Sequence, residues 1–324
     1  MTEERSSEPS RTFNVLDFGA VGDDDTDNTS AFSACVEAAI EAGGGRIYIP
    51  AGVYRGRITI PPFRAKSWLV IEIVGEGQPA PVFGTIGACM PMDNGTIIKG
   101  LATSGPAVIA ATPDPTAPYG QFSMLHVIVR DLEVRTYDDP QIGGIDLQCV
   151  QQCRVESVVV NTGVYNVQAS MPTHGTKGLI TPACNNAAFT ILRNLVVTGY
   201  HTGIVVNEHT DADNIVVASN VNGLEFVQAH HASRFGRVGA YRCPNMVTVT
   251  GQHGFCIEQL NIEKAGPKQT DKGNAWQATV YDINDPDDLG IADINYWVVV
   301  GGVGARDVFN CNGGATIRAR RIGS

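Results

Sequence analysis

Two short stretches near the start of the chain decide the fold: residues 13–32 read FNVLDFGAVGDDDTDNTSAF, and residues 43–54 read GGGRIYIPAGVY. In the first stretch, Asn28 or Thr29 can cap a helix. The apolar residues that follow at helical spacing are Phe32, Val36, Ala39 and Ile40. The three glycines at 43–45 end this helix, and residues 46–54 are predicted to form a strand, a turn and a second strand.

Downstream of this segment, the chain repeats a pattern of glycine followed by apolar, variable and apolar residues. The copies lie at 144–147, 178–181, 203–206 and 223–226, and further apolar segments lie at 157–160, 194–197, 214–217 and 259–262. Gly203 and Gly223 are 20 residues apart, a period typical of a stacked β-solenoid. Alternation of inward and outward residues therefore predicts successive coils over residues 127–265. The side chains expected to point inward are Ile204, Val206, Leu224 and Phe226.

The N-terminal segment resembles the signature of the pectate-lyase superfamily, which includes polygalacturonase-type hydrolases, pectate lyases and phage tailspike depolymerases. The resemblance spans about 45 residues and is specific for fold rather than for activity. It implies an all-β, right-handed parallel β-helix whose N-terminal α-helix caps one open end of the solenoid. We therefore expect a disordered tail at residues 1–11 and a single β-helix domain over residues 12–324.

Composition and charge argue against some classes of binding partner. Its net charge of -10 argues against nucleic acid. No apolar run of about 18 residues is present that would cross a membrane. The polar start carries no signal peptide, so we expect a protein that is cytoplasmic or released without a classical signal. The 8 cysteines lack zinc-like spacing and are expected to be free thiols.

The acidic pattern of the polygalacturonase-type hydrolases is missing from this chain. In that group acidic residues directly precede the glycine of a Gly-Ile-x-Ile strand, but here these positions hold Gly143, Lys177, Thr202 and Asn222. Pectate-lyase chemistry would need a base and a cation such as calcium, which requires several oxygen ligands. The oxygen-rich segment at 282–288 is interpreted as an acidic surface turn. We therefore expect no metal and no cofactor, and keep Ca²⁺ for the lyase alternative alone.

A polar cluster emerges when the coils are superposed at Gly203 and Gly223. Rungs of a parallel solenoid lie about 4.8 Å apart, so this alignment predicts that Asp211 lies beside His231. The catalytic candidates are Glu208, Asp211, Glu225, His230 and His231, and the substrate-binding candidates are Asp146, His209, Asp213 and Arg234. Carboxylates beside imidazoles exchange protons near neutral pH, and we expect Glu208, Asp211, Glu225, His230, His231 and Arg234 to line one groove. A solvated polar turn with ion pairs is the plainer interpretation of the same residues.

The function that these observations favour is a carbohydrate-active enzyme that hydrolyses or rearranges glycosidic bonds. Asp146 and Glu225 occupy the same outward strand position and are expected three rungs apart, about 14 Å, which is too far to act on one bond. The alternatives are a polysaccharide lyase acting by β-elimination and a non-catalytic glycan-binding or structural β-helix of the virion-fibre kind. The resemblance also permits a homotrimer, which is the commonest assembly of the phage members.

Overall fold

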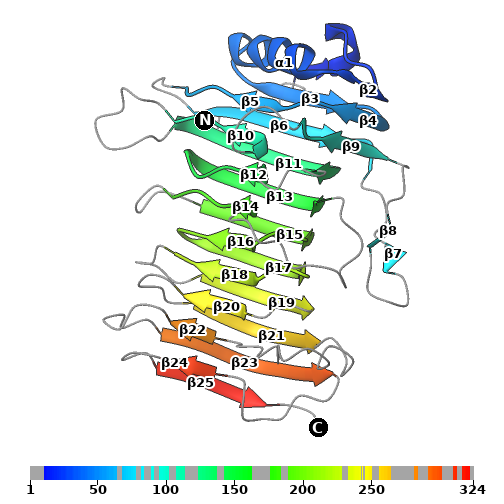
Figure 1. The fold of residues 1–324 in the computed structure, drawn as a ribbon. Coiled ribbons are helices and arrows are strands. Elements are labelled where there is room, and N and C mark those ends of the chain that lie inside the picture. Colours follow the sequence, from blue (N-terminus) through cyan, green and yellow to red (C-terminus); the bar gives the residue numbers. More distant parts are fainter. Residues whose placement is uncertain are drawn as a thin grey trace, which may run out of the picture.

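The chain coils into a column of parallel strands with helix α1 (Thr29–Glu41) at its N-terminal end (Figure 1). The computed structural model describes residues 11–63, 68–77, 82–83, 89–90, 95–101, 107–113, 123–136, 142–162, 176–183, 189–227, 233–241, 243, 245–249, 255–263, 281–283, 291–300, 309–311 and 316–321. The expected tail lies outside these residues except for Arg11. The predicted all-β, right-handed parallel β-helix with an N-terminal helix is confirmed.

Two parallel sheets run the length of the described column. The small sheet contains, in order, β5 (Ile58–Ile60), β10 (Ala107–Ala111), β12 (Gly143–Asp146), β14 (Lys177–Ile180), β16 (Thr202–Val206), β18 (Asn222–Phe226), β20 (Asn245–Val249), β22 (Tyr281–Ile283) and β24 (Phe309–Cys311). The large sheet contains, in order, β1 (Thr12–Asn14), β3 (Gly45–Ile49), β6 (Leu69–Gly75), β11 (Ser123–Arg135), β13 (Val150–Asn161), β15 (Phe189–Thr198), β17 (Thr210–Ala218), β19 (Ser233–Tyr241), β21 (Phe255–Glu263), β23 (Ile291–Val300) and β25 (Thr316–Arg321). Beside this path lie β2 (Asp23–Asp27), β4 (Gly52–Arg55) and β9 (Thr96–Lys99). Strands β7 (Val82–Phe83) and β8 (Cys89–Met90) form a separate antiparallel pair.

The long strands of the large sheet bend at one residue in each coil. Asp131, Ser157, Asn194 and Asn214 have φ values of 58°, 53°, 55° and 54°, in the left-handed region. The pairs that flank them are in register from β11 to β17, so these four residues stack directly over one another. Each long strand therefore has two arms that meet at a corner, and the expected second apolar segment of each coil is the arm after the corner.

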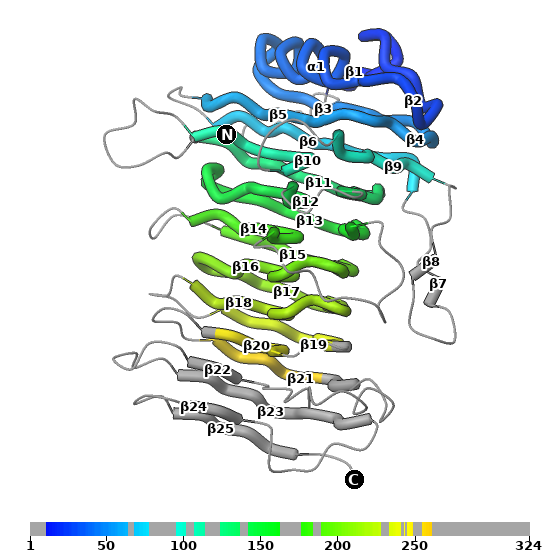
Figure 2. Tube along the Cα trace, viewed as in Figure 1, coloured from blue at the N-terminus to red at the C-terminus, as the bar shows by residue number. Residues whose placement is uncertain are grey.

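The core lies between the sheets and follows the predicted alternation. Ile204, Val206, Leu224 and Phe226 are all 0% exposed, which confirms the inward register over these coils. Burial of each such side chain contributes about 1.5–3 kcal/mol. The glycines at 144, 178, 203 and 223 allow close approach between coils; a Cβ at Gly203, for example, would lie 2.6 Å from the Gly223 carbonyl oxygen. Figure 2 traces the same column from α1 through β21.

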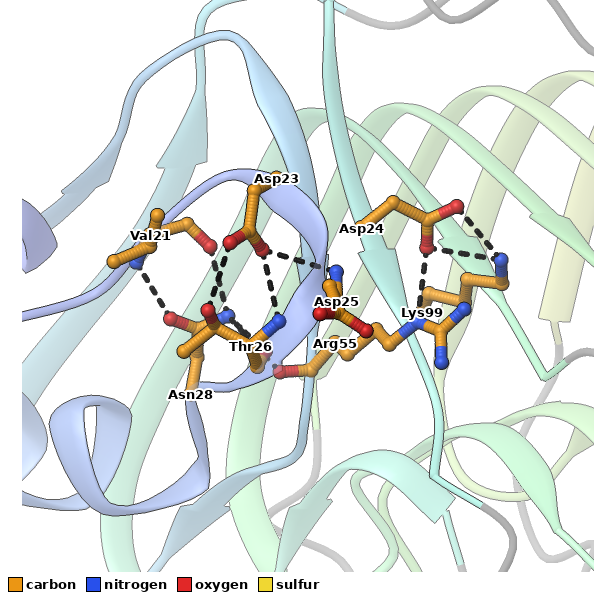
Figure 3. Close-up of polar contacts among 8 residues, drawn as sticks. All are labelled: Val21, Asp23, Asp24, Asp25, Thr26, Asn28, Arg55 and Lys99. Atoms are coloured by element: carbon orange, nitrogen blue, oxygen red, sulfur yellow. Dashed lines mark hydrogen bonds and ion pairs between the residues drawn. The ribbon is translucent and has the colours of Figure 1, made fainter.

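Helix α1 closes the N-terminal end, as expected. It buries Phe32, Cys35, Val36 and Ala39 against the first coils, and Gly43 follows its end with a φ of 83°. Asn28 occupies the N-cap position and the helix begins at Thr29, as predicted, but the Asn28 side chain makes no cap hydrogen bond. Its Oδ1 accepts from the Val21 N–H at 2.6 Å, and its Nδ2 donates to the carbonyl oxygens of Val21, Thr26 and Arg55 (Figure 3).

The acidic turn beside Asn28 ties this cap to the coils. Asp24 accepts hydrogen bonds from Arg55 Nε at 3.0 Å and from Lys99 Nζ at 2.9 Å and 3.0 Å (Figure 3). Arg55 on β4 and Lys99 on β9 are in register on neighbouring rungs. Asp24 therefore links the turn before α1 to two separate coils.

Candidate functional site

One row of outward residues runs down the small sheet in strict register. From β5 to β20 the row consists of Thr59, Ala110, Asp146, Ile180, Val205, Glu225 and Thr248. Asp146 and Glu225 are the two carboxylates of this row between β5 and β20. They are separated by β14 and β16, which confirms the predicted spacing of three rungs.

Glu225 is half-buried within a group of neutral polar side chains. Thr202 Oγ1 donates to Glu225 Oε2 at 3.0 Å, and Asn222 Nδ2 lies 3.5 Å from Thr202 Oγ1. Asn245 Nδ2 donates to Asn222 Oδ1 at 2.8 Å, and Thr248 Oγ1 reaches the same oxygen at 3.4 Å. These five residues, from β16, β18 and β20, form what we call the Glu225 patch.

Most of the Glu225 patch was missed from the sequence. Thr202 and Asn222 occupy the position before a strand glycine, where acidic residues were sought and not found. These two positions do carry polar side chains, but they are a hydroxyl and an amide instead of the carboxylates of the polygalacturonase-type pattern. Asn245 and Thr248 lie in a coil without the glycine pattern, and only the register of β20 on β18 brings them to Glu225.

Asp146 forms a second, separate polar position on the same row. Only 7% of Asp146 is exposed, so the expected outward residue is buried under its surroundings. Its Oδ1 accepts from the Gln148 N–H at 3.1 Å and its Oδ2 from Gln148 Nε2 at 3.3 Å. Burial raises the pKa of Asp146 above its ordinary value, against the opposing effects of the Gln148 hydrogen bond and the charge of Lys177. A carboxyl group of this kind retains its proton at a higher pH than a solvated one.

The predicted contact of Asp211 with His231 is wrong. The small sheet does repeat at 20 residues, with Val205 beside Glu225, but Asp211 of β17 pairs with Arg234 of β19, 23 residues later. The reason is a longer connection: β18 ends at 226 and β19 begins at 233, whereas β16 ends at 206 and β17 begins at 210. His230 and His231 lie outside the described residues, and their catalytic roles stay predictions.

The members of the single groove expected from the sequence come from two different sheets. Asp211 and Arg234 project from the large sheet, whereas Glu225 projects from the small sheet. Asp211 accepts from Arg193 Nη2 at 2.5 Å and from Arg234 Nη1 at 3.2 Å, and Arg234 Nε donates to Glu258 at 2.6 Å. This arrangement is a ladder of exposed ion pairs, as in the plainer interpretation of the cluster.

Asp213 and the turn at 208–209 complete the predicted set. Asp213 Oδ1 accepts from the N–H groups of Arg237 at 3.0 Å and Asn214 at 2.9 Å, and these bonds lower the pKa of Asp213. Asp213 therefore stabilises the backbone at the strand corner next to it. Glu208 and His209 lie on the turn between β16 and β17, with Glu208 1% exposed.

A metal-binding cluster and a membrane-spanning helix are both absent from the described residues. Among the described residues, no group of three His, Cys, Asp or Glu side chains is arranged to hold a metal ion. Most of the acidic segment at 282–288 lies outside them. Within the described ranges, no helix has the length and hydrophobicity of a membrane span. The cysteines described as free thiols are Cys35, Cys149, Cys153, Cys243 and Cys256.

Two known proteins resemble this chain over a short segment, and one solved structure can be superposed on most of its length. Mannuronan C5-epimerase AlgE3 from Azotobacter vinelandii is 58% identical over 43 residues, which is 13% of this chain and 2% of that protein. Alginate lyase 7 from the same organism is 56% identical over 43 residues, again 13% of this chain and 5% of that protein. This chain thus matches only a small part of the length of these relatives. The solved structure of ORF18 from Geobacillus virus E2 is 15% identical, with a TM-score of 0.49 over 97% of this chain and 62% of that chain.

A family model places most of the chain in one group. The model described as rhamnogalacturonase A/epimerase, pectate lyase-like, matches residues 12–236. These residues run from β1 into β19 and include the cap, the coils that carry Asp146 and all of the Glu225 patch except Asn245 and Thr248. Because the match spans more than half of the chain, this protein belongs to the rhamnogalacturonase A/epimerase, pectate lyase-like family of carbohydrate-active β-helix proteins.

Proposed function

We propose that the protein is an enzyme that binds a poly- or oligosaccharide along the outer face of the small sheet and hydrolyses a glycosidic bond at the Glu225 patch. The observation that carries this proposal is the patch itself. It combines one half-buried carboxylate with two hydroxyl and two amide side chains from three successive rungs. Neutral donors and acceptors of this kind match the hydroxyl groups of sugars, and each hydrogen bond contributes about 0.5–1.5 kcal/mol.

Glu225 is the reacting group in this proposal. A carboxylate held by the Thr202 hydroxyl can take a proton from an attacking water molecule, which makes it a general base. Asp146, about 14 Å away along the row, would bind the chain at a distant subsite instead of acting on the same bond.

A second candidate reaction is β-elimination from a uronate-containing glycan, and Asp146 is the observation that favours it. Elimination requires a base for the proton next to the uronate carboxylate and a positive charge that offsets that carboxylate. Asp146 is a carboxyl group with a raised pKa, and the Lys177 ammonium group acts on it from the next strand of the sheet. The two candidate reactions therefore use different residues of one outward face.

The two reactions are distinguished by their products. We expect a panel of neutral and uronate glycans to yield new reducing ends without the ultraviolet absorbance of an unsaturated sugar. Glu225→Gln is expected to lower kcat by about 100-fold or more, because it removes proton transfer and keeps the shape of the side chain. Thermal denaturation should show an almost unchanged Tm for this variant.

The matched control is Glu156→Gln on the outer face of the large sheet. Glu156 is a half-buried carboxylate that pairs with Arg154 at 2.7 Å, so it resembles Glu225 in burial but not in location. We expect this variant to keep its activity.

An unsaturated product that is lost in Asp146→Asn and retained in Glu225→Gln would establish elimination instead. Glycan binding without any product would contradict an enzymatic role. The homotrimer permitted by the family resemblance stays a prediction.

A further inference from the structure

Exposed apolar side chains gather on the outer face of the large sheet, near the start of its long strands. Five large hydrophobic side chains are exposed among the described residues, and three of them lie here: Trp68 at 45%, Val70 at 43% and Phe189 at 53%. The other two, Leu16 and Val21, belong to the segment before α1. Single exposed apolar residues are ordinary, but a group of them on one face indicates a binding surface.

The group is continuous because the strands that carry it are in register. Val70 of β6, His126 of β11, Gln152 of β13 and Phe189 of β15 are aligned partners on four successive strands (Figure 1). The residues on either side of Val70 and of His126 are buried, so these side chains point outward. Trp68, two residues before Val70, is exposed on the same side. We call these five residues the aromatic strip, which spans three rungs, or about 14 Å, from Val70 to Phe189.

The middle of the aromatic strip offers neutral hydrogen-bonding groups. His126 and Gln152 are half-buried between the apolar ends. Burial, together with the charge of Arg154, lowers the pKa of His126, so its ring is neutral at physiological pH. A neutral imidazole has one donor and one acceptor, and an amide has both kinds of group. Aromatic faces combined with a few neutral polar groups suit a ligand that has apolar faces and hydroxyl groups, as a sugar ring does.

The charges beside the aromatic strip are already engaged with one another. Glu72 follows Val70 by two residues, and it accepts from Arg46 Nε at 2.6 Å and from Arg130 Nε at 2.7 Å. Arg154 follows Gln152 by two residues, and its Nη2 lies 2.7 Å from Glu156 Oε1. A ligand on the strip therefore meets paired charges, which favours an uncharged ligand over a uronate or a phosphate.

The width of the aromatic strip distinguishes a glycan from a protein partner. Most of the strip is one side chain wide, and ion pairs border it. A stable protein interface buries about 800 Å² on each partner around an apolar core. A single row about 14 Å long is too narrow for such a core, whereas a linear chain of sugars that lies along the column would cover it.

We propose that the aromatic strip binds an uncharged segment of a poly- or oligosaccharide that lies along the column on the large sheet. Trp68 and Phe189 stack on the apolar faces of sugar rings, and His126 and Gln152 hydrogen-bond to hydroxyl groups between them. This binding site goes beyond the proposed hydrolysis, since it lies on the other sheet from Glu225 and no bond is cleaved there. A polymer held at the strip has a raised effective concentration for a second site on the same molecule.

The test follows the indole N–H signal of Trp68 by NMR, which is assigned from its loss in Trp68→Phe. The protein is titrated with neutral hexasaccharides of glucose, mannose, galactose and xylose, and we expect at least one of them to shift this signal. Phe189→Ala should raise the Kd roughly 3- to 10-fold, because one of two stacking rings is lost, with an unchanged Tm. Leu16→Ala removes a similarly exposed apolar side chain outside the strip and should keep the wild-type Kd.

Three results would overturn this inference. The first is a Trp68 signal that no neutral hexasaccharide moves, or a Kd that Phe189→Ala leaves unchanged. The second is a galacturonate hexasaccharide that binds as tightly as the best neutral one. The third is a wild-type oligomer that dissociates in Trp68→Ala during sedimentation, which would make the strip an interface between copies of this chain. The Trp68 signal reports on the strip alone, so full activity in Glu225→Gln would reject the proposed catalytic site and leave the strip standing.

Discussion

At the scale of single residues, the carboxylates of this chain fall into two groups according to the side chains that contact them. Their spacing in the sequence does not predict these groups. Asp211 and Asp24 accept hydrogen bonds from two cationic side chains each, and they hold strands and the cap together. Glu225 is bonded to a hydroxyl group, and Glu208 stands behind an imidazole. Carboxylates paired with fixed cations serve to hold the fold together, whereas a carboxylate bonded to a hydroxyl group can also contact a neutral ligand.

Asp24 makes a testable contribution to acid stability. Burial alone would raise the pKa of Asp24, but hydrogen bonds from Lys99 and Arg55 outweigh it and hold that pKa below its ordinary value. The stabilisation is therefore present above the unfolded-state pKa and is lost as pH falls through the lower folded-state pKa. We expect Asp24→Asn to lower the free energy of unfolding at neutral pH by a few tenths to about 1 kcal/mol, since the pair is partly exposed.

The measurement is Tm as a function of pH for Asp24→Asn and for the control Asp25→Asn. Asp25 lies in the same turn, and its contact there is a backbone N–H that donates to Asp23 at 2.9 Å (Figure 3). The difference between wild type and Asp24→Asn should disappear in acid, and Asp25→Asn should match wild type throughout. A difference that persists below the folded-state pKa of Asp24 would show that the ion pairs are not its source.

At the scale of elements, the corner of each long strand is fixed by one residue. Asn194 and Asn214 adopt left-handed φ values of 55° and 54°, and Asn214 Nδ2 donates to Asn194 Oδ1 at 2.9 Å. Asparagine is one of the few residues that tolerates this conformation, and its amide can also bond to the coil above. The apolar segments that begin at 157, 194 and 214 in the sequence are therefore second arms of bent strands.

Substitution of Asn214 separates the two contributions. Asn214→Ala should lower the free energy of unfolding by about 1–2 kcal/mol for the left-handed backbone, plus roughly 1 kcal/mol for the lost hydrogen bond. Asn214→Gly loses the hydrogen bond but adopts the corner without strain, so it should cost less than Asn214→Ala. Denaturant unfolding of the three proteins measures both differences. Equal stability of the Ala and Gly variants would contradict the strain argument.

At the scale of the whole molecule, each coil packs only on its neighbours, and the first coil depends on α1. Phe32 of this helix is 0% exposed and lies 6.2 Å, between ring centroids, from Tyr54 of β4. A solenoid end without its cap exposes core side chains and strand edges, which favours aggregation. The acidic turn and the helix therefore protect the column that carries the Glu225 patch.

Loosening the cap should destabilise the whole column from that end. Phe32→Ala is expected to cost about 3–5 kcal/mol and to bring the onset of aggregation to a lower temperature. Ser30→Ala, at an exposed position of the same helix, is the control and should behave as wild type. Light scattering during a temperature ramp, combined with circular dichroism, measures both effects. Aggregation that begins at the same temperature in both variants would show that the cap does not protect the column.

The sequence by itself determined the fold class, the cap and the inward register. These features depend on local alternation and spacing, and so Ile204, Leu224 and Phe226 were placed correctly. The three-rung separation of Asp146 and Glu225 also followed from the sequence, because the glycine pattern keeps one phase along these four strands.

Only the tertiary structure decided which side chains meet between coils. The partner of Asp211 depends on the length of the connection after β18, which adds three residues to that coil of the large sheet and replaces His231 with Arg234. Likewise, the small exposed fractions of Asp146 and Glu208 did not follow from the strand pattern. A strand fixes the face on which a residue lies, but loop lengths fix its lateral neighbours, and it is these neighbours that set the chemistry of a carboxylate.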